Sequence, residues 1–386
     1  MGYQPDTGSA DIPRERRFAA FRRSERLLSG VRPTSIHDRL TELSALHEPS
    51  TDGVAAYDLD QRPDFYGDGI ARTLEVRVAG LLGKPDAVFF PTGTMAQQAA
   101  LRIWAERSGN RTVAMHPLAH PEVHERRAYA RLSGLDAVWP TAAPRLPTAG
   151  ELRCLGEHFG SLMIELPLRE AGFLLPTWTE LVELVGAARE RGAAVHLDGA
   201  RLWESTRHFD RTLPEITAVA DSVYVSFYKT LGGISGGALA GSGDFVREAR
   251  AWRHRYGGQL YQQWPAVLSA LAGLDRELPR LDEYVAHART VAAALARVPG
   301  ARVFPEPPHT HQFQLWLPYP AKALDEAGLR LAEERGIALF WGWLEPGEPG
   351  LAGHSVTEVT VAAEALTWTP EEISEAMVAF LALLQS

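Results

Sequence analysis

Short apolar segments alternate with helical patterns from about residue 69 onward, and this alternation constrains the fold more than any other feature of the sequence. Apolar strands that alternate with helices form a mostly parallel sheet covered by helices on both faces. The sequence therefore predicts an α/β fold. Its strand candidates are AVFF (87–90), TVAM (112–115), DAVW (136–139), SLMIEL (161–166), AAVHL (193–197), SVYVSF (222–227) and GALAGS (237–242).

Three parts are predicted along the chain. Residues 1–64 are polar and rich in arginine, which predicts an N-terminal arm with one short helix at 36–46. Residues 65–290 predict a large domain that holds the sheet, and residues 291–386 predict a small C-terminal α+β domain. The elements predicted around the second boundary are a long helical stretch at 265–298, strands near 311–317, 337–343 and 356–361, and a final helix at 370–385.

Composition excludes several classes of protein. A net charge of −9 argues against a general nucleic-acid binder. The single cysteine, Cys154, excludes an intrachain disulfide and a multi-cysteine metal site. No apolar run approaches the roughly 20 residues of a membrane helix, and the first residues lack the apolar core of a secretory signal. We expect a soluble, cytoplasmic protein with no bound metal.

Lysine is scarce, which draws attention to one lysine in a glycine-rich stretch. Only Lys84, Lys229 and Lys322 are lysines among 39 basic residues. Lys229 follows the apolar segment at 222–227 and precedes four glycines at 232, 233, 236 and 237. Burial lowers the pKa of a lysine and makes its amine nucleophilic, as Schiff-base chemistry requires, and the glycines would let the backbone approach a bulky ligand.

Two further motifs precede this lysine. Thr92, Gly93 and Thr94 join a strand to a helix, and Thr92 or Thr94 is placed to cap that helix. Such a turn is either an ordinary cap or an anion site, usually for phosphate. Asp198 directly follows the apolar segment AAVHL, where it either pairs with Arg201 or faces a protonated ring nitrogen.

Together, the three motifs are more specific than any one of them alone. The anion site, the strand-end aspartate and a lysine 31 residues later follow one another on consecutive strand–helix units. Pyridoxal 5′-phosphate (PLP) requires this combination: a helix end for its phosphate, an aspartate for its pyridinium nitrogen and a lysine for its aldehyde.

The segments PTGTMA, HLDGAR and YKTLGG resemble those of the threonine aldolase/β-eliminating lyase family of PLP enzymes, and the resemblance runs from about residue 64 to 275. It implies the aspartate-aminotransferase (type I) fold and a homodimer or homotetramer. It also implies that Thr92, Gly93 and Thr94 hold phosphate. Asp198 would face the ring nitrogen, Arg201 would contact the phenolic side of the ring, and Lys229 would hold the cofactor.

Two more site residues follow from this resemblance. His120 stands 13 residues before Ser133, the spacing of the family's ring-stacking histidine before its own Ser-Gly. His120 could also belong to a surface loop, because HPLAHPEVH contains three histidines. Ser226 forms S-x-x-K with Lys229, similar to a phosphate contact in aminotransferases, or it is a buried strand serine.

The chain also departs from the family pattern. The small-domain arginine that binds the substrate carboxylate has no counterpart, because no lysine or arginine follows Arg335. Tyr261 replaces an arginine of the family, and Tyr228 replaces the serine before the lysine. Arg169 is our candidate for the substrate carboxylate, with Arg22 or Arg23 of the arm as the alternative; Arg169 could instead pair with Glu170.

We predict a PLP-dependent lyase that cleaves the Cα–Cβ bond of a β-hydroxy-α-amino acid to glycine and an aldehyde. Lys229, Asp198 and His120, the last as base, would be its catalytic residues. Trp316, Trp341 and Trp343 would pack in the core or form the wall of a pocket for a bulky substrate. The alternatives are β-elimination or transamination of another amino acid, and a regulatory protein without activity.

Overall fold

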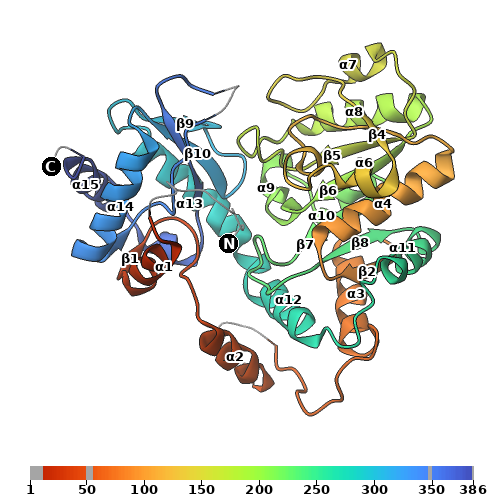
Figure 1. The fold of residues 1–386 in the computed structure, drawn as a ribbon, viewed down its shortest axis with the longest axis horizontal. Coiled ribbons are helices and arrows are strands. Elements are labelled where there is room, and N and C mark those ends of the chain that lie inside the picture. The colour runs from red at the N-terminus through yellow and green to blue at the C-terminus, as the bar shows by residue number, and fades with distance from the viewer. Residues whose placement is uncertain (1–11, 49–54, 347–349, 385–386) are drawn as a thin grey trace. The chain divides into compact units, whose positions relative to one another are not determined.

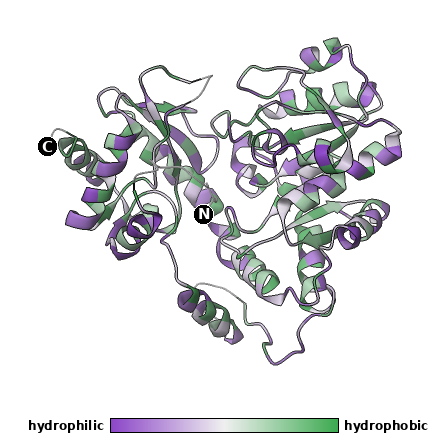
Figure 2. Cartoon of the chain, in the orientation of Figure 1, coloured by the Kyte–Doolittle hydropathy of each residue, from purple (hydrophilic) through white to green (hydrophobic). Residues whose placement is uncertain are grey.

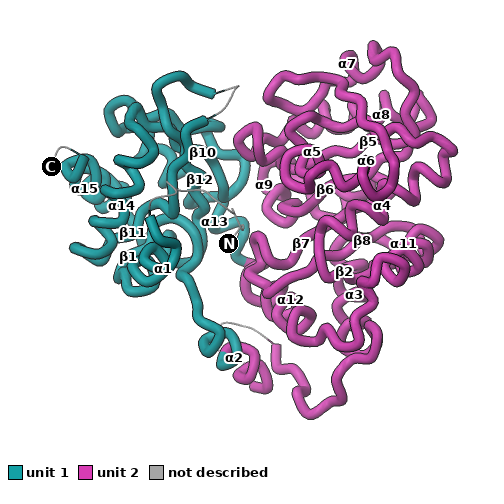
Figure 3. Tube along the Cα trace, in the orientation of Figure 1, with its two compact units in different colours: residues 1–41, 280–386 teal, residues 42–279 magenta. Residues whose placement is uncertain are grey.

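The computed structural model describes residues 12–48, 55–346 and 350–384. The chain forms two compact units (Figure 3): unit 1 is Met1–Thr41 with Arg280–Ser386, and unit 2 is Glu42–Pro279. The boundary near residue 41 falls inside helix α2 (Ile36–Ser44). These units differ from the predicted domains in that residues up to 41 belong with the C-terminal part of the chain, where α1 (Arg14–Arg23) packs against α14 (Ala321–Arg335).

Unit 2 is built on a seven-stranded sheet with the order β2-β8-β7-β6-β5-β3-β4 (Figure 1). The strands are β2 (Asp86–Phe90), β3 (Thr112–Ala114), β4 (Asp136–Val138), β5 (Ser161–Glu165), β6 (Ala194–Gly199), β7 (Ser222–Ser226) and β8 (Gly237–Gly241). All seven predicted segments form strands, and the predicted α/β fold is confirmed. Every residue of β5, β7 and β8 is buried, so both faces of the sheet are covered. Figure 2 shows hydrophobic residues gathered on these strands.

One strand does not follow the parallel pattern. Neighbouring strands from β7 through β6, β5 and β3 to β4 are parallel, whereas β8 runs antiparallel to both β7 and β2. A parallel connection needs a crossover of a dozen or more residues. Only a short loop links β7 to β8, so the chain must reverse there.

Helices surround this sheet. Helix α4 packs against β5 to β8 and against α11, while α8 packs against β6. Thr92 caps α4 by accepting the Met95 N–H at 3.3 Å, and Gly109 ends α4 in the left-handed conformation. The helices of unit 2, besides the end of α2, are α3 (Ile70–Leu81), α4 (Gly93–Ser108), α5 (His120–Val123), α6 (Ala128–Ser133), α7 (Ala149–Cys154), α8 (Trp178–Glu190), α9 (Thr206–Phe209), α10 (Leu213–Ala218), α11 (Gly243–Arg255) and α12 (Trp264–Arg276).

Unit 1 contains a three-stranded antiparallel sheet, β12-β10-β9, and a parallel two-stranded pair, β1-β11. Its core includes the aromatic side chains of Phe340, Trp343 and Phe380. The elements of this unit, besides α1, α14 and the start of α2, are β1 (Arg26–Leu27), β9 (Arg302–Phe304), β10 (Gln312–Leu317), β11 (Ile337–Ala338), β12 (Ser355–Thr360), α13 (Leu281–Leu295) and α15 (Pro370–Ala382).

Two predictions for this region are corrected. The helical stretch 265–298 is two helices, α12 and α13, because a 3-10 turn at Leu278–Arg280 interrupts it around Pro279, which lacks a backbone N–H. The strand predicted near 337–343 extends only over Ile337–Ala338, where it pairs with β1. Trp343 therefore lies in the core rather than on a strand, and Trp341 packs edge-on against Phe21. Trp316 does lie on β10 and is half-buried.

None of the helices in the described residues has both the length and the apolar character required to span a bilayer.

Candidate active site

Three polar side chains form a row across neighbouring strands of unit 2. Glu165 on β5, Asp198 on β6 and Tyr224 on β7 are partners in the register of the sheet. Residues paired in register point to the same face. His196, two residues before Asp198, contacts Gln97 of α4 at 2.9 Å, so this face is covered by α4. Glu165 and Asp198 lie at the carboxyl ends of their strands, where sites of α/β proteins form.

Asp198 is buried, and its pKa is shifted by its surroundings. One of its oxygens, Oδ1, accepts the Ala200 N–H at 3.1 Å. Burial raises the pKa of Asp198, while Lys229 and His120 act against that rise. A buried carboxylate in this position is stabilised by a positive partner.

Lys229 lies in the loop after β7, and neighbouring groups fix that loop on both sides. The Trp203 indole N–H donates to the Ser226 carbonyl at 2.9 Å, and Thr230 donates to Glu204 at 2.7 Å. Desolvation, followed by the Arg201 charge, lowers the pKa of Lys229 to about 8. About a tenth of its amine is therefore unprotonated at pH 7, and this fraction is able to act as a nucleophile.

The glycines after Lys229 have a packing role. A Cβ on Gly236 would lie 2.4 Å from Phe89 Cζ, and one on Gly233 would lie 2.9 Å from the Phe227 carbonyl oxygen. Gly236 also has a φ of +89°, which other residues rarely adopt. Protein atoms, rather than the approach of a ligand, thus explain these two glycines.

The N-terminus of α4 meets the buried hydroxyl of Tyr224. A Cβ on Gly93 would lie 2.2 Å from that hydroxyl oxygen, so only glycine fits there. Within the described residues, no group gives the Tyr224 hydroxyl a hydrogen bond of normal geometry. The amides of Gly93 and Thr94 have no partner inside the helix. Amides and a phenol at one helix N-terminus suit an anion.

His120 is held by a buried glutamate. Its Nδ1 lies 3.1 Å from Glu125 Oε1, and Gln98 of α4 donates to Glu125 Oε2 at 3.3 Å. Desolvation, then the charge of Lys229, lowers the pKa of His120 to about 3, so the ring is neutral at neutral pH. Desolvation raises the pKa of Glu125 to about 7, and Thr94 is among the hydrogen-bond partners that oppose the rise.

The other predicted residues have varied surroundings. Arg201 is buried, with its guanidinium 5.4 Å from the centre of the Phe173 ring. The Ser226 hydroxyl donates to the Ala200 carbonyl at 2.7 Å, as a buried strand serine does. Arg169 is buried, and its Nη1 lies 3.1 Å from Glu170 and 3.2 Å from His124. In unit 1, Arg22 pairs with Asp38 at 2.8 Å and Arg23 is exposed.

Sequence reasoning missed three members of this cluster: Glu165, Glu125 and Tyr224. For Glu165 a signal was present, because it is an acidic residue near the carboxyl end of the apolar segment SLMIEL, much as Asp198 directly follows AAVHL. Glu125 and Tyr224 gave no comparable signal, because a glutamate in a polar loop and a tyrosine in a strand are common. Their roles depend on contacts with α4, which only the fold reveals.

The chemistry of this cluster fits one kind of cofactor. A nucleophilic amine at Lys229 suits a carbonyl group, the buried acid at Asp198 suits a basic ring nitrogen, and the N-terminus of α4 with Tyr224 suits an anionic arm. In the described part of the chain, no group of three or more His, Cys, Asp or Glu side chains is arranged to hold a metal ion.

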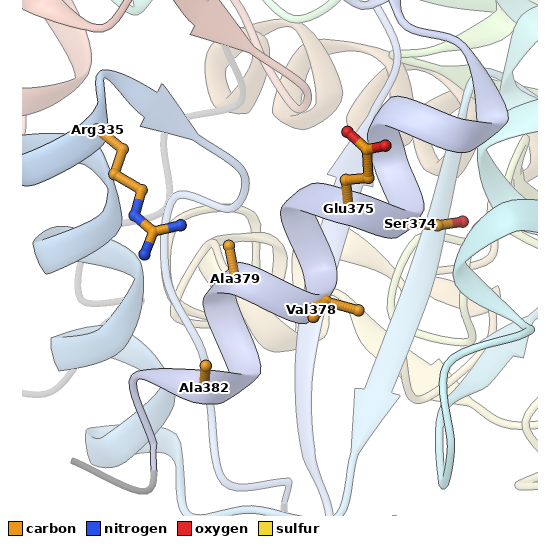
Figure 4. Close-up of a pocket in the computed structure, with 6 residues that line it drawn as sticks. All are labelled: Arg335, Ser374, Glu375, Val378, Ala379 and Ala382. Atoms are coloured by element: carbon orange, nitrogen blue, oxygen red, sulfur yellow. The ribbon is translucent and has the colours of Figure 1, made fainter.

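An apolar depression lies elsewhere, on the surface of unit 1 (Figure 4). It has a volume of about 510 Å³ and is lined by Arg335, Ser374, Glu375, Val378, Ala379 and Ala382. Five of these residues come from α15, and none belongs to the cluster around Lys229.

Comparisons with known proteins give related matches. The β-eliminating lyase family profile matches residues 55–316. The low-specificity L-threonine aldolase of Escherichia coli K12 is 31% identical over 227 residues, which cover 57% of this chain and 67% of that protein.

Two solved structures also resemble this chain. A candidate L-allo-threonine aldolase from Listeria monocytogenes has 35% identity and a TM-score of 0.85, covering 96% of this chain and 99% of its own. A variant of the serine palmitoyltransferase of S. paucimobilis, determined with a bound PLP–myriocin aldimine, shares the fold: its TM-score is 0.62 at 17% identity, over 92% of this chain and 86% of that one. The chain described here belongs to the β-eliminating lyase family.

Proposed function

We propose that this protein is a PLP-dependent lyase that cleaves the Cα–Cβ bond of a β-hydroxy-α-amino acid and releases glycine and an aldehyde. The observation that carries the proposal is the cluster of Lys229, Asp198 and His120 in unit 2: Lys229 and Asp198 each shift the pKa of the other, and both shift the pKa of His120. Relatives named as threonine aldolases, at about 30% identity, support the same activity.

PLP, when bound, supplies a conjugated ring that accepts the electron pair left when a bond to Cα breaks. Lys229 would hold the aldehyde carbon, and Asp198 would keep a proton at the ring nitrogen. The amides at the start of α4, with Thr92, Thr94 and the Tyr224 hydroxyl, would hold the phosphate. Arg201 would face the phenolic side of the ring, and Ser226 would support this loop through its bond to Ala200.

His120 would act as the base. Glu125 lies against Nδ1, and its ionised carboxylate would accept a hydrogen bond from Nδ1–H and so leave the Nε2 lone pair for the substrate. The low pKa of His120 keeps the ring in its neutral form. Nε2 would take the proton of the β-hydroxyl group as the aldehyde departs.

The products of the purified enzyme distinguish this function from its rivals. With threonine, allo-threonine and phenylserine, we expect glycine and the corresponding aldehyde in equal amounts. Pyruvate and ammonia from serine would instead indicate β-elimination, and an oxo acid formed with loss of the amine would indicate transamination. If the PLP-loaded protein consumed none of these substrates, the result would contradict all three catalytic functions.

Arg169 is the proposed partner of the substrate carboxylate. It is buried in the same unit as Lys229, and a guanidinium can bind a carboxylate with two hydrogen bonds. Charge-assisted bonds contribute about 1.5–3 kcal/mol, so Arg169→Leu should lower kcat/KM by roughly 10- to 100-fold. Because the carboxylate is common to all substrates, threonine and phenylserine should lose equally.

The matched control is Arg22→Leu, which removes an exposed arginine paired with Asp38 on unit 1. We expect this variant to keep normal kcat/KM. Normal values for Arg169→Leu together with a large loss for Arg22→Leu or Arg23→Leu would place the carboxylate site on the N-terminal arm.

Exposed aromatic side chains support a homo-oligomer. Phe65, Tyr66 and Tyr261 are exposed, and Tyr261 packs edge-on against each of the other two. Leu260 and Trp264 are also exposed. Grouped apolar side chains at a surface favour association with another protein surface.

A further inference from the structure

Glu165 connects two loops that carry candidate site residues. Its Oε2 accepts the backbone N–H of His120 at 2.8 Å, and its Oε1 accepts the backbone N–H of Arg169 at 3.3 Å. Glu165 is the last residue of β5 and is buried, so the two loops are anchored to the rigid sheet. Each oxygen of one carboxyl group therefore fixes a different loop.

The same two loops are also joined through their side chains. His124 Nε2 lies 2.7 Å from Glu170 Oε1 and 3.2 Å from Arg169 Nη1. The rings of His120 and His124 are 5.2 Å apart. A displacement of one loop would consequently move the other, because the two loops are connected both through Glu165 and through their own side chains.

We propose that Glu165 is a positioning residue whose two carboxyl oxygens set the backbones of His120 and Arg169, and hence the placement of base and carboxylate partner relative to Asp198. The inference rests on the proposed function in so far as His120 and Arg169 act on the substrate. Catalysis is sensitive to misplacement of about 1 Å, so a residue that touches neither substrate nor cofactor would still control turnover.

The ionisation of Glu165 is consistent with this role. Burial, followed by the neighbouring charge of Asp198, raises the pKa of Glu165 to about 8. Both carboxyl oxygens retain lone pairs in either protonation state and can accept an N–H bond. The amide nitrogen of a glutamine cannot accept one, so Glu165→Gln keeps at most one of the two backbone contacts.

The test combines kinetics with hydrogen–deuterium exchange on the full-length, PLP-loaded protein. In the wild type, the His120 and Arg169 amides should exchange at least tenfold more slowly than exposed amides of the same loops. In Glu165→Gln, exchange should rise at one of these two amides, and in Glu165→Ala at both. We expect kcat to fall roughly 10-fold in the first variant and 100-fold in the second, with PLP affinity changed less than threefold.

Asp221→Ala is the matched control. Asp221 Oδ2 accepts the Val195 N–H at 2.7 Å, so this variant removes a carboxylate–backbone contact outside the cluster around Lys229. Exchange should rise at Val195 alone, and kcat should stay within twofold.

Two outcomes would overturn the inference. One is fast amide exchange at His120 and Arg169 in the wild type, a measurement that does not depend on whether any variant folds. The other is a fall in kcat for Glu165→Ala with exchange at both amides unchanged, which would place the effect on Asp198 or the cofactor. Failure of the proposed function is distinguishable: if the wild type cleaves no β-hydroxy amino acid, the exchange pattern still shows whether Glu165 holds the two loops.

Discussion

Replacing Lys229 with alanine is expected to abolish turnover and the visible absorption band of the cofactor–lysine linkage, while the chain remains folded. Both Asp198 and Arg201 influence the pKa of Lys229, and its pKa of about 8 suits a nucleophilic amine. Loss of covalent catalysis costs many orders of magnitude in rate, so residual activity should lie at the detection limit. Circular dichroism measures the fold, and absorbance near the cofactor band measures its binding.

The other two lysines provide matched controls. Lys84 donates to the Ala220 carbonyl at 2.7 Å, and Lys322 lies on α14 of unit 1. Lys84→Ala should cost about 1 kcal/mol of stability and leave kcat unchanged, and Lys322→Ala should likewise leave kcat unchanged. An active, yellow Lys229→Ala enzyme would contradict the account.

Asp198→Ala is expected to show the second largest loss. A carboxylate at the ring nitrogen stabilises the charge that develops when the bond to Cα breaks, and it contributes much less to the bound ground state. Removal of an interaction made mainly in the transition state lowers kcat rather than affinity. We expect kcat to fall roughly 10³-fold, with PLP affinity reduced far less.

Asp198→Asn separates charge from size. Because asparagine keeps the shape but cannot stabilise a protonated ring nitrogen, its kcat should fall nearly as far as that of alanine. Near-normal turnover in both variants would show that Asp198 serves only to pair with a neighbouring cation such as Arg201.

The sequence was most informative where local pattern and tertiary environment agree. The strands of unit 2 are continuous apolar segments because helices cover both faces of the sheet, and such segments are recognisable without the fold. By contrast, β9 (Arg302–Phe304) is three residues long, with only its middle residue buried, and was not predicted. β11 forms only because β1, more than 300 residues earlier, pairs with it.

The residues of the candidate site were likewise predictable from the sequence only in part. Lys229 and Asp198 were identified because their chemistry is unusual after an apolar strand. Glu165 follows the same rule and could have been found. The contact between Tyr224 and Gly93 and the support of His120 by Glu125 depend on how α4 packs, which spacing along the chain does not encode.

The site of covalent attachment tests the central claim most directly. The purified protein is loaded with PLP, reduced with borohydride, digested and examined by peptide mass spectrometry. Because the chain has only three lysines, the result is unambiguous. We predict a pyridoxyl group on Lys229 at close to one per chain; a label on Lys84 or Lys322, or no label at any lysine, would contradict the assignment of Lys229.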